Sequence, residues 1–168
     1  MKELISICLL ILTLNLAAQE NNERLSRDSS VLAMPVDDGS FFESRIPTSP
    51  FIVGPKILQL FPGETVFIEI EQSNGIITDI KSVKENKNPD KTLEISFIQN
   101  AEGKKHSNMT LKLKNPFKKD LSYEATIRLM KTGKWVKTSI IPVKAGLMGF
   151  EIWPDVIISI ALNEWKFL

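Results

Sequence analysis

The sequence is short of the residues that usually crosslink or catalyse. Its 168 residues include one cysteine, Cys8, one histidine, His106, and one tyrosine, Tyr123. A zinc or copper site needs several His or Cys ligands, and His106 has no second one beside it. No G-x-S-x-G, P-loop or G-x-G-x-x-G motif occurs, so nucleophilic catalysis at such an elbow and nucleotide binding have no support. We therefore expect no catalytic residues, no metal site and no cofactor.

The N-terminus has the form of a cleavable secretory signal. Met1-Lys2 precedes an apolar run from Leu4 to Leu14, and Leu16-Ala17-Ala18 supplies a small-residue exit. The run is shorter than the roughly 20 apolar residues that cross a membrane. Residues 1–18 are thus predicted to be removed, together with Cys8, leaving a protein without disulfides whose stability comes from a core. We expect export to the periplasm or beyond the cell, in a bacterial envelope, with no transmembrane span.

The rest of the chain divides by its pattern. Residues 19–50 are polar, contain three prolines and show no sustained period, which predicts a flexible leader. Phe41 and Phe42 could alternatively dock as an early strand. From Phe51 to Leu168 apolar and polar residues alternate, with turn residues at short intervals and an Asn74-Gly75 hairpin signal. This pattern predicts one all-β domain of about nine short antiparallel strands, with a polar loop over residues 100–107.

One segment indicates which all-β architecture to expect. Asp120-x-x-Tyr123-x-Ala125 resembles the tyrosine corner of immunoglobulin-like domains, in which a Tyr hydroxyl bonds back to the corner backbone. Ala125 stands where antibody domains have a Cys, so the disulfide form is excluded. The resemblance implies a Greek-key, immunoglobulin-like β-sandwich and no particular activity. A corner hydrogen bond predicts that Tyr123→Phe costs about 1–2 kcal/mol. In the alternative, the ring packs in the core without that bond.

Net charge is nearly balanced along the whole chain but not within it. The formal net charge is +1, which does not suggest a nucleic-acid partner, yet residues 101–140 hold ten basic and three acidic residues, a net +7. Lysines that alternate with apolar residues are expected on the solvated face of a sheet, and lysines also protect strand edges. The other interpretation is a basic surface for an anionic envelope component or another envelope protein. The candidate surface residues are Lys104, Lys105, Lys112, Lys114, Lys118, Lys119, Trp135 and Trp153.

Two further features allow alternatives. Trp153 lies between Glu151 and Asp155 and could be a platform for a sugar or a peptide, or could cap the end of the core. Carboxylate pairs could perform glycoside hydrolysis without a histidine. The candidate pairs are Glu69 with Glu71 and Glu151 with Asp155, and the first pair is expected to face solvent.

Three classes of function follow. The sequence favours a non-catalytic binding or accessory module of the envelope. The second class is a structural or assembly subunit that adds a strand to a partner, using the apolar C-terminal strand from Val156 to Phe167. The third is a carboxylate-based glycoside hydrolase.

Overall fold

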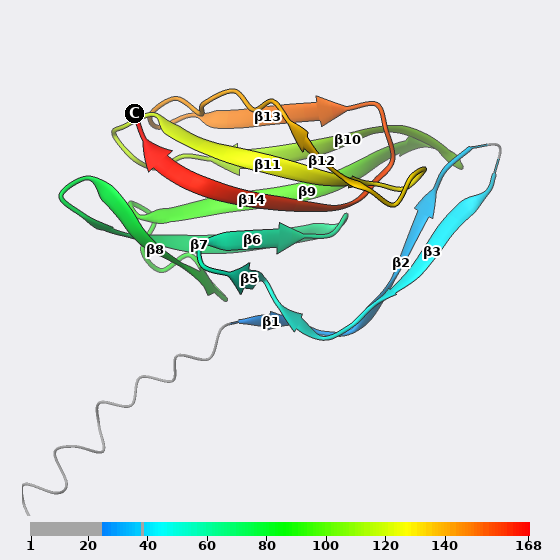
Figure 1. Cartoon of the computed structure of the whole chain (residues 1–168), viewed down its shortest axis with the longest axis horizontal. Helices are drawn as coiled ribbons and strands as arrows, with labels where there is room; N and C mark the ends of the chain where they lie inside the picture. Colours follow the sequence, from blue (N-terminus) through cyan, green and yellow to red (C-terminus); the bar gives the residue numbers. More distant parts are fainter. Residues whose placement is uncertain (1–24, 38) are drawn as a thin grey trace, which may run out of the picture.

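The computed structural model describes residues 25–37 and 39–168, and every regular element in these ranges is a β-strand (Figure 1). The predicted signal peptide and the first residues of the predicted leader lie outside the described residues. No helix in the described part of the chain is long and apolar enough to cross a membrane.

Ten strands form two five-stranded sheets, and every neighbouring pair is antiparallel. Sheet I has the order β13 (Met148–Trp153), β10 (Lys105–Lys114), β9 (Thr92–Glu102), β7 (Glu64–Ser73), β8 (Ile76–Val83). Sheet II has the order β12 (Trp135–Thr138), β11 (Leu121–Leu129), β14 (Ile157–Phe167), β6 (Ile57–Leu60), β5 (Ile52–Gly54). The sheets form two layers (Figure 1). This arrangement confirms the predicted all-β, antiparallel class and is that of a β-sandwich.

A single core fills the space between the sheets, as the alternation predicted. Leu93, Ile95 and Phe97 on β9 are fully buried, whereas Glu94 between them is exposed. They belong to one cluster with Leu58 of β6 and other side chains from both sheets. Burying an aliphatic side chain of this size contributes about 1.5–3 kcal/mol, so this cluster is the main stabilising feature of the fold.

The turns follow local backbone preferences. Asn74 and Gly75 both have positive φ, 51° and 79°, as the predicted hairpin turn requires. The predicted polar loop over residues 100–107 is wrong, because β9 and β10 continue to Glu102 and from Lys105, with a tight turn at Gly103. The polar residues there line an exposed ribbon, where Asn100 donates hydrogen bonds to Asn108 and Thr110 instead of forming a loop.

Residues 25–37 and 39–50, which belong to the predicted flexible leader, contain regular structure. Four strands precede the sandwich: β1 (Ser26–Arg27), β2 (Ser30–Pro35), β3 (Phe41–Ile46) and β4 (Ser49–Pro50). The β2–β3 hairpin buries Leu32, Met34 and Ile46 against Phe61, Val156 and Ile158 of the sandwich. Phe41 and Phe42 lie in β3, in line with the alternative prediction. The hairpin is short, so too few apolar residues alternate for the pattern to register in the sequence.

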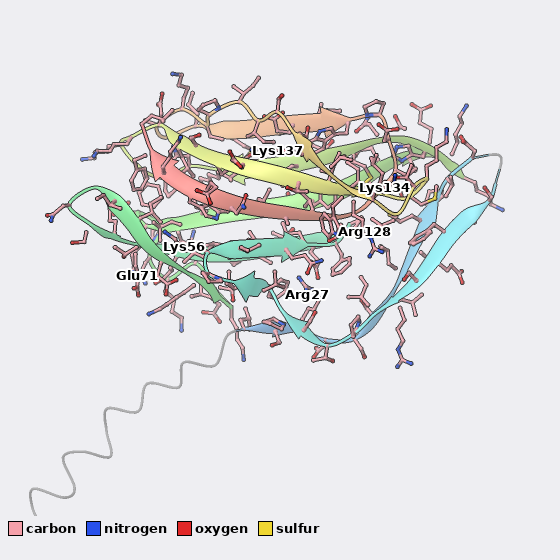
Figure 2. All side chains as sticks on the ribbon, in the orientation of Figure 1. Arg27, Lys56, Glu71, Arg128, Lys134 and Lys137 are labelled. Carbon is pink, nitrogen blue, oxygen red and sulfur yellow. The ribbon has the colours of Figure 1, made fainter. Side chains whose placement is uncertain are left out.

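Arg27 attaches β1 to the sandwich (Figure 2). Its side chain is 4% exposed and forms an ion pair with Glu64 at 2.6 Å. It also donates to the backbone carbonyls of Pro50 and Gln59, and its guanidinium lies 4.6 Å from the ring centre of Phe51. A buried guanidinium needs this full set of partners, so Arg27 holds the N-terminal segment against one side of the sandwich.

Each sheet has two edge strands, and they fall on two sides of the molecule. β12 and β13 lie along one side, where the indole N–H of Trp153 donates to the hydroxyl of Thr138. β5 and β8 lie along the opposite side, near β1 (Figure 1). The first side carries the candidate site.

Candidate functional site

The six candidate lysines do not form one cluster. Lys112 and Lys114 project from the outer face of β10, opposite Ser96 and Glu94 of β9. Lys104 and Lys105 lie at the turn where β10 begins, whereas residues 118–119 follow its other end. A ten-residue strand is about 33 Å long, so the two end pairs are far apart. Only Lys112 and Lys114 are neighbours on one face, and neither makes an ion pair with a described residue.

The two candidate tryptophans differ. Trp153 is partly buried, packs against the core and meets Phe97 edge to face at 6.5 Å between ring centres. It therefore closes the end of the core, with its N–H bonded to Thr138 rather than to a backbone carbonyl. Trp135 begins β12 and is 44% exposed.

Tyr123 lies in the core but makes no corner hydrogen bond. Its residue is 5% exposed and its ring stacks on Trp165 at 5.2 Å. Within the described ranges the hydroxyl has no hydrogen-bond partner, which agrees with the alternative prediction and not with the corner bond. Burial raises the pKa of Tyr123, and the nearby Glu151 carboxylate raises it further, so the hydroxyl stays a hydrogen-bond donor.

The corner between β10 and β11 is held by Asp120 and by Asn115, which the sequence analysis passed over. The side-chain amide of Asn115 donates to the carbonyls of Lys119, Val143 and Lys144, and its oxygen accepts from the backbone N–H of Phe117. Asn115 is completely buried. Asn115-Pro116 is locally only a signal for the end of a strand, because two of the three carbonyl partners lie 28 and 29 residues further along the chain.

Asp120 fixes the same corner from outside. One carboxylate oxygen accepts from the Lys144 ammonium at 2.7 Å and the other from the backbone N–H of Ala145 at 3.0 Å. These bonds, that to Lys144 first, lower the pKa of Asp120 below its ordinary value. Asp120 and Asn115 together position the segment that leads into β13.

The candidate catalytic carboxylates are engaged in other contacts. Glu69 forms an ion pair with Lys91 at 3.0 Å and accepts from Asn88 at 2.6 Å, and Glu71 pairs with Lys81. The Asn88 bond, opposed in part by burial and assisted by Lys91, lowers the pKa of Glu69.

The second pair and the histidine are also accounted for. Glu151 accepts a hydrogen bond from the backbone N–H of Ile141, and Asp155 lies in an exposed turn. Both ring nitrogens of His106 are occupied, one 2.9 Å from the Gln99 amide and the other 3.0 Å from the carbonyl of Pro154. The described residues contain no group of three His, Cys, Asp or Glu side chains placed to hold a metal ion.

The most unusual surface is the β12/β13 side. Seven of the twelve large apolar side chains that are exposed in the described chain lie between residues 135 and 152. They are Trp135, Val136, Ile141, Leu147, Met148, Phe150 and Ile152. Met148, Phe150 and Ile152 are 48%, 54% and 63% exposed and form a row along the outer face of β13. The row lies beside Thr110, Lys112 and Lys114 of β10, their cross-strand partners.

The backbone of β13 is free along the same row. The N–H of Asn115 donates to the carbonyl of Leu147, and this pair continues the register in which Lys114 faces Met148. Hydrogen-bonded and non-bonded pairs alternate along an antiparallel ladder. The pairs at Gly149, Glu151 and Trp153 are therefore bonded to β10. Met148, Phe150 and Ile152 consequently direct their N–H and C=O groups away from β10, and no bond joins these groups to another described residue.

A small hollow adjoins this edge. It has a volume of about 190 Å³ and lies between residues 141–144 and β13. Tyr123, Glu151 and Phe150 contribute to its wall. A Cβ on Gly149 would lie 2.5 Å from a Val143 methyl carbon, so glycine allows residue 143 to pack closely against β13.

The C-terminal strand is not available for strand addition. β14 lies between β11 and β6 and is paired on both sides, so the predicted role of residues 156–167 in joining a partner is wrong for this strand. The free edge belongs to β13, a short strand that Pro154 follows, and nothing in its sequence marks it as an edge.

No protein-family model, curated protein or solved structure matches this chain.

Proposed function

We propose that the chain is an exported, non-catalytic binding module of the bacterial cell envelope, and that it binds an anionic partner through β13 and the adjoining lysines of β10. One observation carries the proposal. β13 presents a row of exposed apolar side chains, Met148, Phe150 and Ile152, beside Lys112 and Lys114. Exposed apolar patches with a polar rim mark interaction sites in soluble proteins.

The charge distribution supports an anionic partner. The segment of net +7 contains β10, β11, β12 and the loops between them. β10 lies next to β13, so this positive charge adjoins the exposed edge. Exposed charges of one sign attract an oppositely charged partner over a distance of about 8 Å at physiological salt. Lys112 and Lys114 have no ion-pair partner among the described residues, so they are free to meet such a partner.

The fold proposal is an immunoglobulin-like, Greek-key sandwich. It is supported by two antiparallel five-stranded sheets and by the return of the last strand, β14, to the middle of sheet II. That fold serves many unrelated functions, so the functional proposal rests on the β13 surface alone.

Export is proposed from the N-terminal pattern. The mature protein is expected to begin at Gln19, because Leu16-Ala17-Ala18 fits the peptidase exit. N-terminal mass analysis of protein from its native host tests this. A chain that retains Met1, or carries a lipid on Cys8, would contradict the proposed route.

Binding is tested with three anionic probes at low and physiological salt: phosphatidylglycerol vesicles, an acidic polysaccharide and a glutamate-rich peptide. We expect at least one to bind, more weakly as salt rises, and expect the variant Lys112→Ser/Lys114→Ser to lose most of that binding. Lys84→Ser/Lys87→Ser is the matched control, because these exposed lysines directly follow β8, the edge strand of sheet I opposite to β13. No binding at low salt, or equal loss in both variants, would refute the proposed surface.

An assembly subunit that adds strands to a partner is the second candidate. The free backbone edge of β13 favours this function. An assembly subunit needs the backbone groups of that edge, whereas a simple binding module needs only the side chains around it.

A further inference from the structure

We propose that β13 is a docking edge that accepts, as an added β-strand, an extended acidic segment of another protein. This inference rests on the proposed binding function and specifies its partner. The partner segment would extend sheet I beyond β13 and become its sixth strand. Its apolar side chains would lie beside Phe150 and its neighbours on the outer face.

The backbone of β13 is open to an added strand. Met148, Phe150 and Ile152 each turn one N–H and one C=O to the open edge, and the same three residues carry the exposed apolar side chains. An added strand satisfies both features at once, since main-chain hydrogen bonds give affinity and alternate side chains give specificity. Proteins that do not use a long apolar edge normally protect it with charges, proline or a covering segment.

The open backbone of β13 fits a polypeptide better than a lipid surface. An apolar row beside lysines would also suit an anionic membrane. However, the unpaired N–H and C=O groups of β13 have no partner in a hydrocarbon layer, and open sheet edges do not occur there. An extended polypeptide supplies those partners.

The positive charge beside β13 disfavours a second copy of this chain as the occupant of the edge. Two copies joined edge to edge would bring Lys112 and Lys114 of each chain toward the same new sheet, within two segments of net +7. Like charges in proximity disfavour such pairing, whereas a segment with acidic residues is attracted. The occupant is therefore a different protein with carboxylates among its strand residues.

The hollow beside the β13 edge has room for side chains of an added strand. Side chains of an added strand that point inward would enter the space of about 190 Å³ next to Gly149 and Glu151. Tyr123 lines this space, is 5% exposed, and has a hydroxyl without a partner among the described residues. No buried side-chain polar atom of the described residues lacks a partner, so this hydroxyl is reached by solvent at the hollow. An acceptor on the incoming segment would replace water there.

The experiment uses the mature protein and a short synthetic peptide whose outward positions carry valine and glutamate in turn, with threonine at the inward positions between them, so that both kinds of side chain lie on the face of Phe150, Lys112 and Lys114. A control peptide has the same side chains but carries N-methyl groups on its central amides, which removes the donors for a β-ladder. We expect the first peptide to bind at least roughly tenfold more tightly than the control, since several backbone hydrogen bonds are lost together. Amide hydrogen exchange should become slower at Met148, Phe150 and Ile152 only with the first peptide.

Two variants localise the effect. Phe150→Pro removes an N–H that points to the open edge, and proline is tolerated in edge strands, so the fold should persist while peptide binding falls at least roughly tenfold. Phe150→Ser tests the side chain, with Ile76→Ser as its control, because Ile76 is equally apolar and 69% exposed but lies on β8. Only the substitutions at Phe150 should weaken binding.

The outcomes distinguish this inference from the proposed function. Equal binding of both peptides, with unprotected β13 amides, overturns strand addition but leaves a binding module. Binding to vesicles and to neither peptide overturns it in favour of a lipid surface. A dimer detected by light scattering and abolished by Phe150→Pro overturns it in favour of a second copy. Absence of binding to every anionic probe overturns both proposals.

Discussion

The two edges of sheet I are built in opposite ways. On β8, the carbonyl of Ile77 accepts from the Lys56 ammonium, and the N–H of Ile80 donates to the Asp79 carboxylate. The hydroxyl of Ser82 bonds to the carbonyl of Leu25 beside β1, so the N-terminal segment lies against this edge. β13 has no lysine, and its one charged residue, Glu151, bonds to Ile141.

The difference shows that this chain can protect a strand edge and does so on one side only. Charged side chains and a covering segment are the usual means of preventing edge-to-edge association. β8 has both. On β13 the one charged side chain bonds to Ile141, and residues 141–144 leave the outward backbone groups of Met148, Phe150 and Ile152 unpaired beside exposed apolar side chains. We infer that the β13 edge is left unprotected because a partner strand binds there.

The largest expected effect is a loss of stability when the N-terminal segment no longer packs against the β8 side. Arg27→Met removes one partner of the buried Arg27–Glu64 pair, and such a loss costs about 3 kcal/mol or more. Chemical denaturation should show this decrease in the free energy of unfolding, with faster exchange of β8 amides. Arg45→Met, at an exposed arginine of β3, is the control and should change little. Equal effects of the two variants would contradict the role given to Arg27.

The next effect concerns the segment that positions β13. Asn115→Ala leaves the carbonyls of Lys119, Val143 and Lys144 without their buried donor, and we expect a loss of about 2 kcal/mol. Peptide binding at β13 should weaken as well, because residues 143–147 lead into this strand. Urea denaturation measures the first effect and titration calorimetry the second. The control Asn86→Ala, in an exposed loop, should leave stability and peptide binding unchanged. If Asn115→Ala also left both unchanged, Asn115 would not hold the corner that leads into β13.

A smaller effect depends on pH. The pKa of Asp120 is lowered in the folded protein, by its bond to Lys144 first. Its contribution to stability is therefore present above the unfolded-state pKa and is lost as pH falls through the lowered folded-state pKa. Wild type should lose part of its stability relative to Asp120→Asn between neutral pH and pH about 3. Parallel pH profiles of urea midpoints for the two proteins would contradict this contribution.

The smallest expected effect on stability is that of Tyr123→Phe. The hydroxyl makes no hydrogen bond within the described chain, so the free energy of unfolding should change by less than about 0.5 kcal/mol. This replaces the loss of about 1–2 kcal/mol that a tyrosine corner predicts. Peptide binding should nevertheless weaken, since the hydroxyl lines the hollow beside β13. A stability loss without any change in binding would favour a structural role for the hydroxyl.

The sequence predicted the features that depend on neighbouring residues. Alternation at Leu93, Ile95 and Phe97 identified a buried strand face, and Asn74-Gly75 identified a hairpin, because both signals are local. It did not predict that β13 lies at an edge. Residues 156–167 are strongly apolar because β14 is central in sheet II, and the same property made that strand resemble a free one.

The candidate site was predicted only in part. Lys112 and Lys114 were identified from their alternation with Leu111 and Leu113, which is again local. The exposure of Phe150 and Ile152 depends on the place of β13 in the sheet, which no local pattern in the sequence indicates. The partners of Asn115 and Arg27 lie up to 37 residues away, and no local pattern indicates them.

Amide hydrogen exchange of the free protein tests the central claim, that β13 is an open edge, most directly. The account predicts alternation along one strand: fast exchange at Met148, Phe150 and Ile152, and slow exchange at Gly149, Glu151 and Trp153, whose N–H groups bond to β10. Uniformly slow exchange at all six amides would show that another segment already covers the edge, and would contradict the account.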